Sequence, residues 1–313
     1  MKLTSYYAYL DISNPIACWE VSIGRIVAPE LNSPDSVGIS LWGYNIIRRM
    51  SRNIEKFSHF FIRECQLEHI RRVFFPNKCS RLEGAFFFKN ENDVHIALDR
   101  WGKNASLHEQ ACKINFISDR EPTIVDSNYI TYCLGGSDIG WMFKYWAGQP
   151  YQGHEPLWEV ITTGIGYIDK NPRSDKLRQK AYTRMIQTFP DCHLIHRLCQ
   201  IGFEVGFDTI GRATSFLQKT ESSSVIHGKV IMDTRLFNDD QFLSTLSYYL
   251  NVKQPDLPPL PNNHSLGRTP DLSKYFFELD LKNVDERIKK FSSTNSSLAT
   301  ISDHIKIGQI HAL

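Results

Sequence analysis

The chain has 313 residues, of which 42% are hydrophobic and 22% charged, and this composition predicts a packed globular core. Its formal net charge of +2 argues against a nucleic-acid-binding protein that relies on overall attraction to phosphate. The seven scattered cysteines indicate reduced thiols. The N-terminal sequence MKLTSYYAYLDISN lacks a signal peptide's apolar run, and without any run of ~18 apolar residues we expect no membrane span.

The first part of the chain alternates short strands and helices irregularly. Aromatic, apolar or alternating patterns predict strands at residues 5–12, 82–88, 112–117 and 157–163. Helical spacing or capping signals predict helices from Ile54 up to Pro76, at 92–101 and from Ser137 or Asp138 to about Ala147. A segment rich in Gly, Pro and Ser, residues 22–43, predicts a long loop. This irregular order favours an α+β fold over a regular βαβ array.

The later part differs in character. Patterns there predict helices at 175–189 and 194–203, a strand at 225–232, a proline-rich linker at 253–263, a short helix at 283–291 and a mobile tail at 292–313. We therefore expect one unit at residues 1–170, a mostly helical unit at 171–255, and a linker with a flexible tail at 256–313.

Glu159 is the strongest candidate for a catalytic carboxylate. It lies in an apolar predicted strand, where alternation places Leu157, Glu159 and Ile161 on one face. A carboxylate that shares a face with two apolar residues is expected to be partly buried, and it must then be paired or functional. If it points outward instead, it is an ordinary surface acid.

Ser80 and Arg81 stand between a predicted helix and a predicted strand. Arginine offers a planar fork of donors that can hold a phosphate or a ribose. The alternative is a turn whose arginine pairs with a nearby carboxylate, and for this segment taken alone the turn is the simpler interpretation.

Four metal-type ligands fall within eight residues: Cys192, His193, His196 and Cys199. One rigid helix cannot wrap four ligands tetrahedrally around zinc, and no second ligand pair follows at finger-like spacing. We therefore expect a packed helix with the thiols inside and no metal. Neither a Gly-x-Gly-x-x-Gly motif nor a P-loop occurs.

Several segments, taken together in order, resemble a known family. They are Tyr9-Leu-Asp11, Arg63-Glu64, Glu68, Ile70-Arg71-Arg72, Phe75-Pro76, Ser80-Arg81, Phe86, Tyr145-Trp146-x-Gly148 and Pro156-Leu-Trp158-Glu159. The resemblance is to small bacterial proteins with a Tyr-His-Val-Asp strand followed by Phe-Pro-x-x-Pro-Ser-Arg, Tyr-Trp-x-Gly and Trp-Glu. That family is similar to the ADP-ribosyltransferase fold and includes translocated Legionella-type effector mono-ADP-ribosyltransferases. The resemblance covers about residues 3–168.

The resemblance implies an ADP-ribosyltransferase-like split β-sheet core with a helical C-terminal extension, so residues 1–170 would form the catalytic domain. Glu159 would be the transferase glutamate that hydrogen-bonds the nicotinamide ribose. Tyr9 would contact the adenosine ribose or the pyrophosphate. The other implied NAD-contacting residues are Ser80 and Arg81 in the cleft and Tyr145 and Trp146 beside the nicotinamide.

The resemblance also implies NAD as substrate and a host protein as acceptor. Arginine is one acceptor side chain considered, and a metabolic enzyme such as glutamate dehydrogenase is one acceptor protein. The protein would be a monomer that leaves the bacterial cytoplasm for the host cytoplasm without a cleaved signal peptide.

The chain departs from the family pattern at three positions. Tyr9 is neither His nor Arg, Cys79 replaces a proline, and Leu157 removes the Glu-x-Glu pair of arginine-directed transferases. Glu155 lies nearby, but before Pro156 in a loop. Acceptor chemistry therefore stays open, and two alternatives remain: an NAD glycohydrolase and a catalytically inactive binding module on the same fold.

Overall fold

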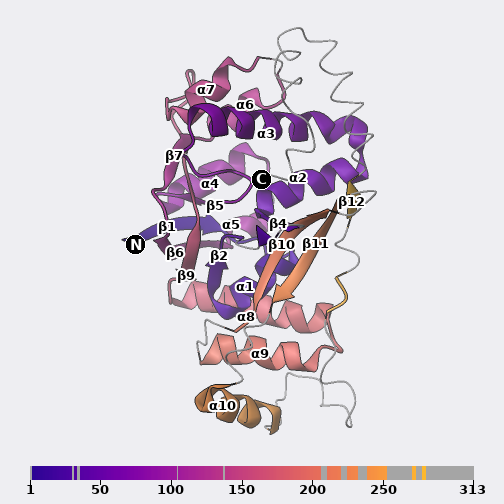
Figure 1. The fold of residues 1–313 in the computed structure, drawn as a ribbon. Coiled ribbons are helices and arrows are strands. Elements are labelled where there is room, and N and C mark those ends of the chain that lie inside the picture. The colour runs from indigo at the N-terminus through magenta and orange to yellow at the C-terminus, as the bar shows by residue number, and fades with distance from the viewer. Residues whose placement is uncertain are drawn as a thin grey trace.

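A computed structural model describes the chain at residues 2–29, 32–33, 36–103, 105–136, 138–205, 210–219, 224–231, 238–251, 270–272 and 277–279. The fold is mixed α+β, as the sequence predicts (Figure 1). Every strand pairing among these residues is antiparallel. The predicted linker at 253–263, helix at 283–291 and tail at 292–313 lie outside the described residues.

The larger sheet has seven strands within the described part of the chain. Their order across the sheet is β2 (Arg25–Val27), β9 (Gly164–Ile168), β6 (Ala111–Ser118), β1 (Lys2–Tyr9), β5 (Ala85–Phe88), β8 (Trp158–Thr162) and β7 (Thr123–Asp126). The strands predicted at residues 5–12, 82–88, 112–117 and 157–163 correspond to β1, β5, β6 and β8 of this sheet.

The junction between β1 and β5 is the weakest line of this sheet. β1 pairs with β6 along its whole length, from Lys2 opposite Ser118 to Tyr9 opposite Ala111. In contrast, β1 is paired with β5 at one described position, Tyr7 opposite Phe88. The two halves, β2-β9-β6-β1 and β5-β8-β7, are thus joined through a single register pair.

A second sheet contains β12 (Phe277–Leu279), β11 (Ser224–Ile231), β10 (Arg212–Lys219), β4 (Ser36–Ile39) and β3 (Asn32–Ser33), in that order. The predicted loop at 22–43 is therefore wrong. That segment holds β2, β3, β4 and the start of a helix, α2, at Leu41. These strands are too short to show a periodicity, and long-range pairing with β9 and β10 stabilises β2 and β4.

Ten helices occur in the described residues. They are α1 (Pro15–Ile23), α2 (Leu41–Arg52), α3 (Ile54–Phe74), α4 (Glu91–Arg100), α5 (Ala105–His108), α6 (Asn128–Cys133), α7 (Gly140–Trp146), α8 (Pro172–Thr188), α9 (His193–Glu204) and α10 (Asp240–Asn251). The helix predicted up to Pro76 is confirmed as α3, and the Asn53 side chain caps it by accepting from the backbone N–H of Lys56. The other predicted helices in this part correspond to α4, α7, α8 and α9.

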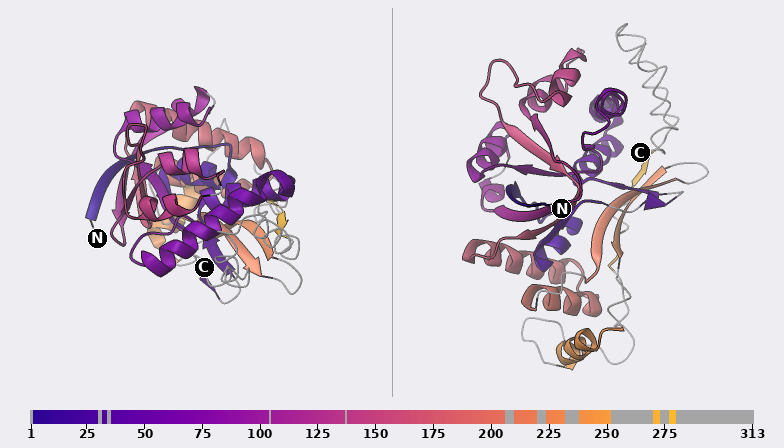
Figure 2. Two further views of the ribbon diagram at one scale, coloured as in Figure 1. Left: turned by 90° about the horizontal axis from the view of Figure 1, so that it is seen from above. Right: turned by 60° about the vertical axis from the view of Figure 1, so that its left-hand side comes forward.

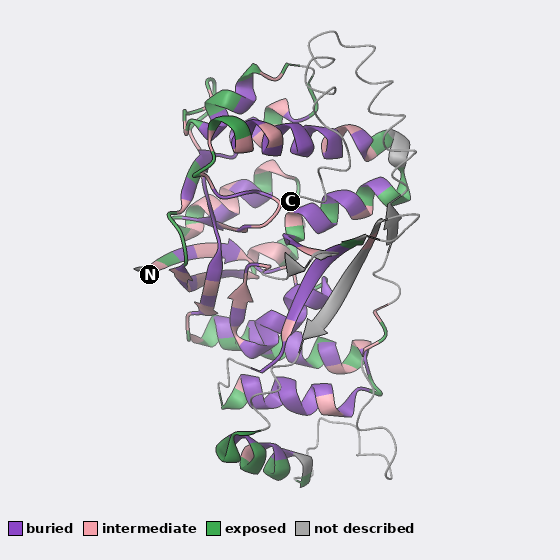
Figure 3. Cartoon of the chain, in the orientation of Figure 1, coloured by how far each residue is buried: buried purple, intermediate pink, exposed green. Residues whose placement is uncertain are grey.

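Helices cover both faces of the larger sheet (Figure 2). One face carries Tyr6, Phe87 and Phe116, and it packs in a single hydrophobic core with α1, α8 and α9. That core contains residues on both sides of position 170, so the two units proposed from the sequence share it. The other face packs against α4 on one half and against α3 and α7 on the other. Figure 3 shows the buried residues concentrated where these layers meet.

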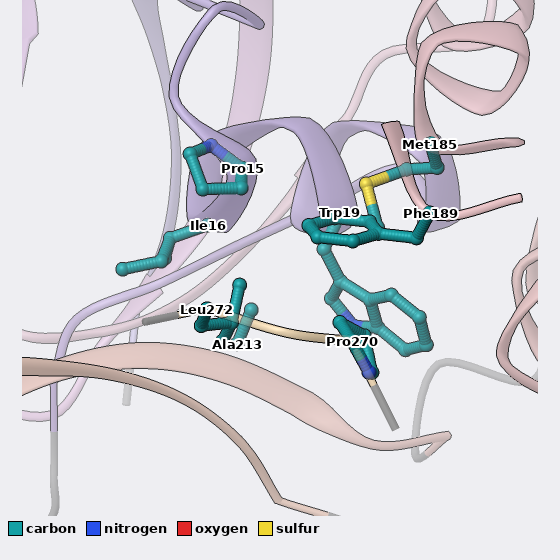
Figure 4. Close-up of a pocket in the computed structure, with 8 residues that line it drawn as sticks. All are labelled: Pro15, Ile16, Trp19, Met185, Phe189, Ala213, Pro270 and Leu272. Atoms are coloured by element: carbon teal, nitrogen blue, oxygen red, sulfur yellow. The ribbon is translucent and has the colours of Figure 1, made fainter. Parts of the chain in front are cut away.

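Figure 4 shows a small cavity beside the hydrophobic core that contains α1, α8 and α9. It lies between α1, α8 and residues 270–272. Trp19, Phe189 and Leu272 are among the side chains that line it. Its volume is about 10 Å³, which is room for about one water molecule. We therefore treat it as a gap in packing and not as a ligand site.

The segment with four metal-type ligands forms α9 and its N-terminal flank. Cys192, His196 and Cys199 are buried, as expected for a packed helix. Among the residues that the structure describes, no group of three or more His, Cys, Asp or Glu side chains is arranged to hold a metal ion. The same residues include no helix with the length and apolarity needed to cross a bilayer.

Burial makes His196 a source of acid sensitivity. Burial, reinforced by neighbouring His193, lowers the pKa of His196 from 6.5 to about 4. Between these values the unfolded chain binds a proton that the folded protein does not, so stability falls as the pH decreases through this range. We expect His196 to account for a loss of about 2 kcal/mol between pH 7 and pH 5. Urea unfolding at both pH values measures this loss, and His196→Gln should remove it; an equal loss in the variant would contradict the assignment.

Candidate functional site

The segment that carries Ser80 and Arg81 is a tight turn between α3 and β5. Its backbone is fixed from two sides. The Ser40 hydroxyl donates to the Arg81 carbonyl at 2.8 Å, and the Gly84 N–H donates to the Ser80 carbonyl at 2.9 Å. The Cys79 N–H donates to the Thr123 hydroxyl in β7 at 2.6 Å. The turn therefore holds position 81 rigidly beside the β5-β8-β7 half of the sheet.

The hydroxyl of Ser80 belongs to a separate ion cluster on α3. It donates to Glu68 at 2.9 Å, and Arg71 donates to both oxygens of the same carboxylate at 2.9 and 2.7 Å. Arg71 also donates to the Lys78 carbonyl at 2.8 Å. Ser80 therefore contacts the carboxylate that binds the turn to α3, and its role here is to hold the turn in place.

The guanidinium of Arg81 lies between two carboxylates. Its Nε donates to Glu64 at 3.1 Å, and one Nη donates to Glu159 at 3.1 Å and to the Tyr145 hydroxyl at 2.6 Å. These four residues are nearly inaccessible, with exposed fractions of 3% for Arg81, 1% for Glu64, 6% for Glu159 and 0% for Tyr145. The donors of Arg81 are thus directed at protein groups. This arrangement is the alternative predicted from the sequence, a turn whose arginine pairs with a nearby carboxylate. We call these four residues the Arg81 cluster.

Three aromatic rings surround the same guanidinium. The Arg81 Cζ atom lies 5.2 Å from the ring centre of Trp42, 5.1 Å from that of Phe86 and 5.6 Å from that of Tyr145. At these distances a ring face attracts a cation. The indole of Trp42 also donates to Glu64 at 2.9 Å, so α2, α3, α7 and β5 all contribute to the same site.

Strand pairing places Glu159 on the face of the sheet that holds these rings. Glu159 in β8 is opposite Phe88 in β5 and opposite Val125 in β7. Directly opposed residues point to the same face, and Tyr7 extends the row onto β1 across the sheet junction. The predicted burial of Glu159 with Leu157 and Ile161 is confirmed.

Tyr9 and Trp146, the remaining two candidate site residues, are buried to different extents. Tyr9 is half-buried, with its ring 6.2 Å from that of Trp101, and burial together with the charges of Asp11 and Glu159 raises its pKa to about 12. Trp146 is fully buried, and its indole donates to the Leu67 carbonyl in α3 at 2.9 Å. Tyr9 is thus within electrostatic reach of Glu159, while Trp146 anchors α7 to α3.

The Arg81 cluster holds an unequal number of charges. Two carboxylates face one guanidinium, so the cluster has one excess negative charge when both acids are ionised. Burial raises the pKa of Glu159, Arg81 opposes that rise, and Glu64 adds to it. Burial alone would lower the pKa of Arg81, but Glu64, Tyr145 and Glu159 together outweigh burial and raise it, so the guanidinium stays protonated. Glu159 is therefore an acid whose proton is held more tightly than usual.

Comparisons with known proteins give no match. No family model, no curated protein and no solved structure is significantly similar to the chain. The chemistry of the site must therefore be argued from its own residues.

No role was predicted from the sequence for Glu64, Trp42 or Phe86. Glu64 and Glu68 stand one helical turn apart on α3, beside the apolar Cys65 and Leu67. Two acids on a face that also carries apolar residues are a signal of buried ion pairs. Trp42 fell within the predicted loop and had no such signal.

Removing the shared cation should destabilise the fold strongly. Arg81→Ala leaves two buried carboxylates without their partner, so we expect unfolding free energy to fall by about 3–5 kcal/mol. Urea unfolding of the purified variant measures the loss. Arg81→Lys keeps the charge but not the fork of donors, and a smaller loss is expected.

Arg173→Ala is a suitable control for this prediction. Arg173 forms an ion pair with Glu91 in which the side chains are 45% and 41% exposed. An exposed pair contributes about 1 kcal/mol or less. If both alanine variants lost the same stability, the Arg81 cluster would not be the buried constraint that we describe.

Proposed function

We propose that this chain is a mono-ADP-ribosyltransferase that cleaves NAD, with Glu159 as the catalytic carboxylate. The observation that carries the proposal is the placement of Glu159: it is buried, held by an Arg81 Nη that also donates to Tyr145, and one strand away from the junction between β1 and β5. Its expected role is to hydrogen-bond the nicotinamide ribose.

The charge of the Arg81 cluster suits this chemistry. Loss of nicotinamide from NAD leaves a ribose with oxocarbenium character, which is positively charged, as in glycoside cleavage. A fixed negative charge in a site with little water stabilises such a transition state more than it would in bulk solvent. When both acids are ionised, the excess negative charge shared by Glu64 and Glu159 around Arg81 is of the required sign.

The shape of the sheet also supports the proposal. The resemblance in sequence implies a split β-sheet whose cleft receives NAD. Here the sheet is joined at one register pair between β1 and β5, and Tyr7, Tyr9 and Glu159 lie on one face across that line. Because Glu159 is 6% exposed, NAD can reach it only if side chains that cover it move.

The acceptor in this proposal is a host protein, with NAD supplying the ADP-ribose. Position 157 carries a buried Leu, and the nearby Glu155 is exposed in the loop before β8. A second carboxylate beside Glu159 on β8 is thus missing, and a base that activates the acceptor has to come from elsewhere. An arginine side chain and a metabolic enzyme such as glutamate dehydrogenase are the acceptors to examine first.

Labelled NAD incubated with the protein and a host-cell lysate tests the proposal. We expect labelled protein and free nicotinamide with the wild type. Glu159→Gln removes the negative charge near the ribose, so labelling should fall by about hundredfold or more. Circular dichroism and urea unfolding establish that the variant is folded under the assay conditions.

Glu155→Gln is the matched control, since it changes an exposed acid four residues away and should leave labelling intact. Undiminished labelling by Glu159→Gln would remove that residue from the catalytic role. Free ADP-ribose without labelled protein would identify an NAD glycohydrolase instead. If the wild type neither releases nicotinamide nor binds NAD, the chain is a non-catalytic binding module.

A further inference from the structure

Glu64 is the most completely buried acid of the Arg81 cluster, and both of its oxygens accept hydrogen bonds. One oxygen accepts from the Trp42 indole at 2.9 Å and from an Arg81 Nη at 3.4 Å. The other accepts from the Arg81 Nε at 3.1 Å. A carboxylate held at both oxygens cannot rotate freely, so Trp42 on α2 and Arg81 in the turn together fix the orientation of Glu64.

This fixed carboxylate orients the guanidinium. Because Glu64 accepts from the Nε side of the planar Arg81 fork, the remaining Nη is directed at Glu159 and Tyr145. The three rings around the guanidinium restrict its tilt. The position of Glu64 therefore determines how Arg81 is oriented, and Arg81 in turn contacts Glu159.

Glu159 is also affected by charged or titratable groups on several of the elements that pack near it. Arg81 in the turn favours its ionised form, and Glu64 on α3 opposes it. Tyr145 on α7 shares a donor of Arg81, and Tyr9 on β1 interacts with Glu159 through its own ionisation. Among these groups, Glu64 is the one whose negative charge acts on Glu159 while it also holds Arg81.

We propose that Glu64 is a positioning residue that, through Arg81, sets both the orientation and the charge state of Glu159. The catalytic consequence rests on the proposed function, but the coupling between the two carboxylates is a property of the folded chain. It can therefore be measured without any substrate.

The test is a titration of the Glu159 carboxyl group in the full-length protein. Protein labelled with ¹³C at the glutamate side-chain carboxyl carbon is titrated by NMR, and the Glu159 signal is assigned by its absence in Glu159→Gln. In Glu64→Gln the repulsive charge is gone while Arg81 remains, so the Glu159 midpoint should move to lower pH. Nicotinamide release from NAD should fall by about tenfold or more, with a shifted pH profile, because Arg81 has lost its orienting partner.

Glu20→Gln is the matched control for loss of a buried ion pair. Glu20 on α1 pairs with Arg25 at 2.6 and 2.9 Å and belongs to the part of the fold on the other face of the sheet. This variant should lose stability but leave the Glu159 midpoint in place. If Glu64→Gln proves too unstable to titrate, Trp42→Phe removes the donor that orients Glu64 and should move the same midpoint.

The outcomes separate the two ideas. An unchanged Glu159 midpoint in folded Glu64→Gln overturns the positioning role, whatever the NAD assay gives. A midpoint that moves equally in Glu20→Gln overturns it as well, because the shift then reflects general destabilisation. A midpoint that moves only in the variants of the Arg81 cluster supports the inference, and it does so even if the wild type releases no nicotinamide, which would reject the proposed function alone.

Discussion

The pairing of one buried guanidinium with two buried carboxylates is the interaction on which the rest of this site depends. Arg81 is reached by side chains from α2, α3, α7, β5 and β8, and these elements are far apart along the chain. Removing charges from water is unfavourable by several kcal/mol per ion unless partners and hydrogen bonds compensate. The fold can bury Arg81 only if all these elements are assembled around it, which couples the position of Glu159 to the packing of the whole β5-β8-β7 half.

Helix α3 organises this half in two successive layers. Glu68 binds Arg71 and Ser80 and thereby fixes the backbone of the turn, while Glu64 one helical turn earlier fixes the guanidinium that the turn presents. The same helix accepts the Trp146 indole at the Leu67 carbonyl. Two acids on one helix thus position the backbone of the turn and the guanidinium of Arg81. This is why a short turn can hold a charged side chain inside a core.

Sequence patterns identified fewer than half of the helices and strands that the structure describes, and they did not identify the partners within the site. The spacing from Ile54 to Phe74 predicted α3, and alternation around Glu159 predicted its burial, because both depend on local periodicity. Trp42 lies in a region of short strands and a helix start that long-range pairing stabilises, so composition alone predicted a loop there. The contact of Arg81 with Glu64 and Glu159 spans 17 and 78 positions, and no local pattern encodes such a pairing.

The charge imbalance of the Arg81 cluster is difficult to explain by stability alone. The buried pair of Glu20 and Arg25 is balanced, and the Ala213 N–H also donates to Glu20. Glu68 meets Arg71 and the more exposed Arg72, so its charge is fully compensated. Glu159 instead shares a guanidinium that Glu64 already engages, and burial raises its pKa. Well-packed apolar side chains commonly stabilise a core as much as a buried ion pair does, so a second carboxylate here is unfavourable for folding. A buried acid with a raised pKa, paired with a specific charge beside the weakest line of a sheet, is a candidate for a functional site, and this is the physical basis for proposing Glu159 as the catalytic carboxylate.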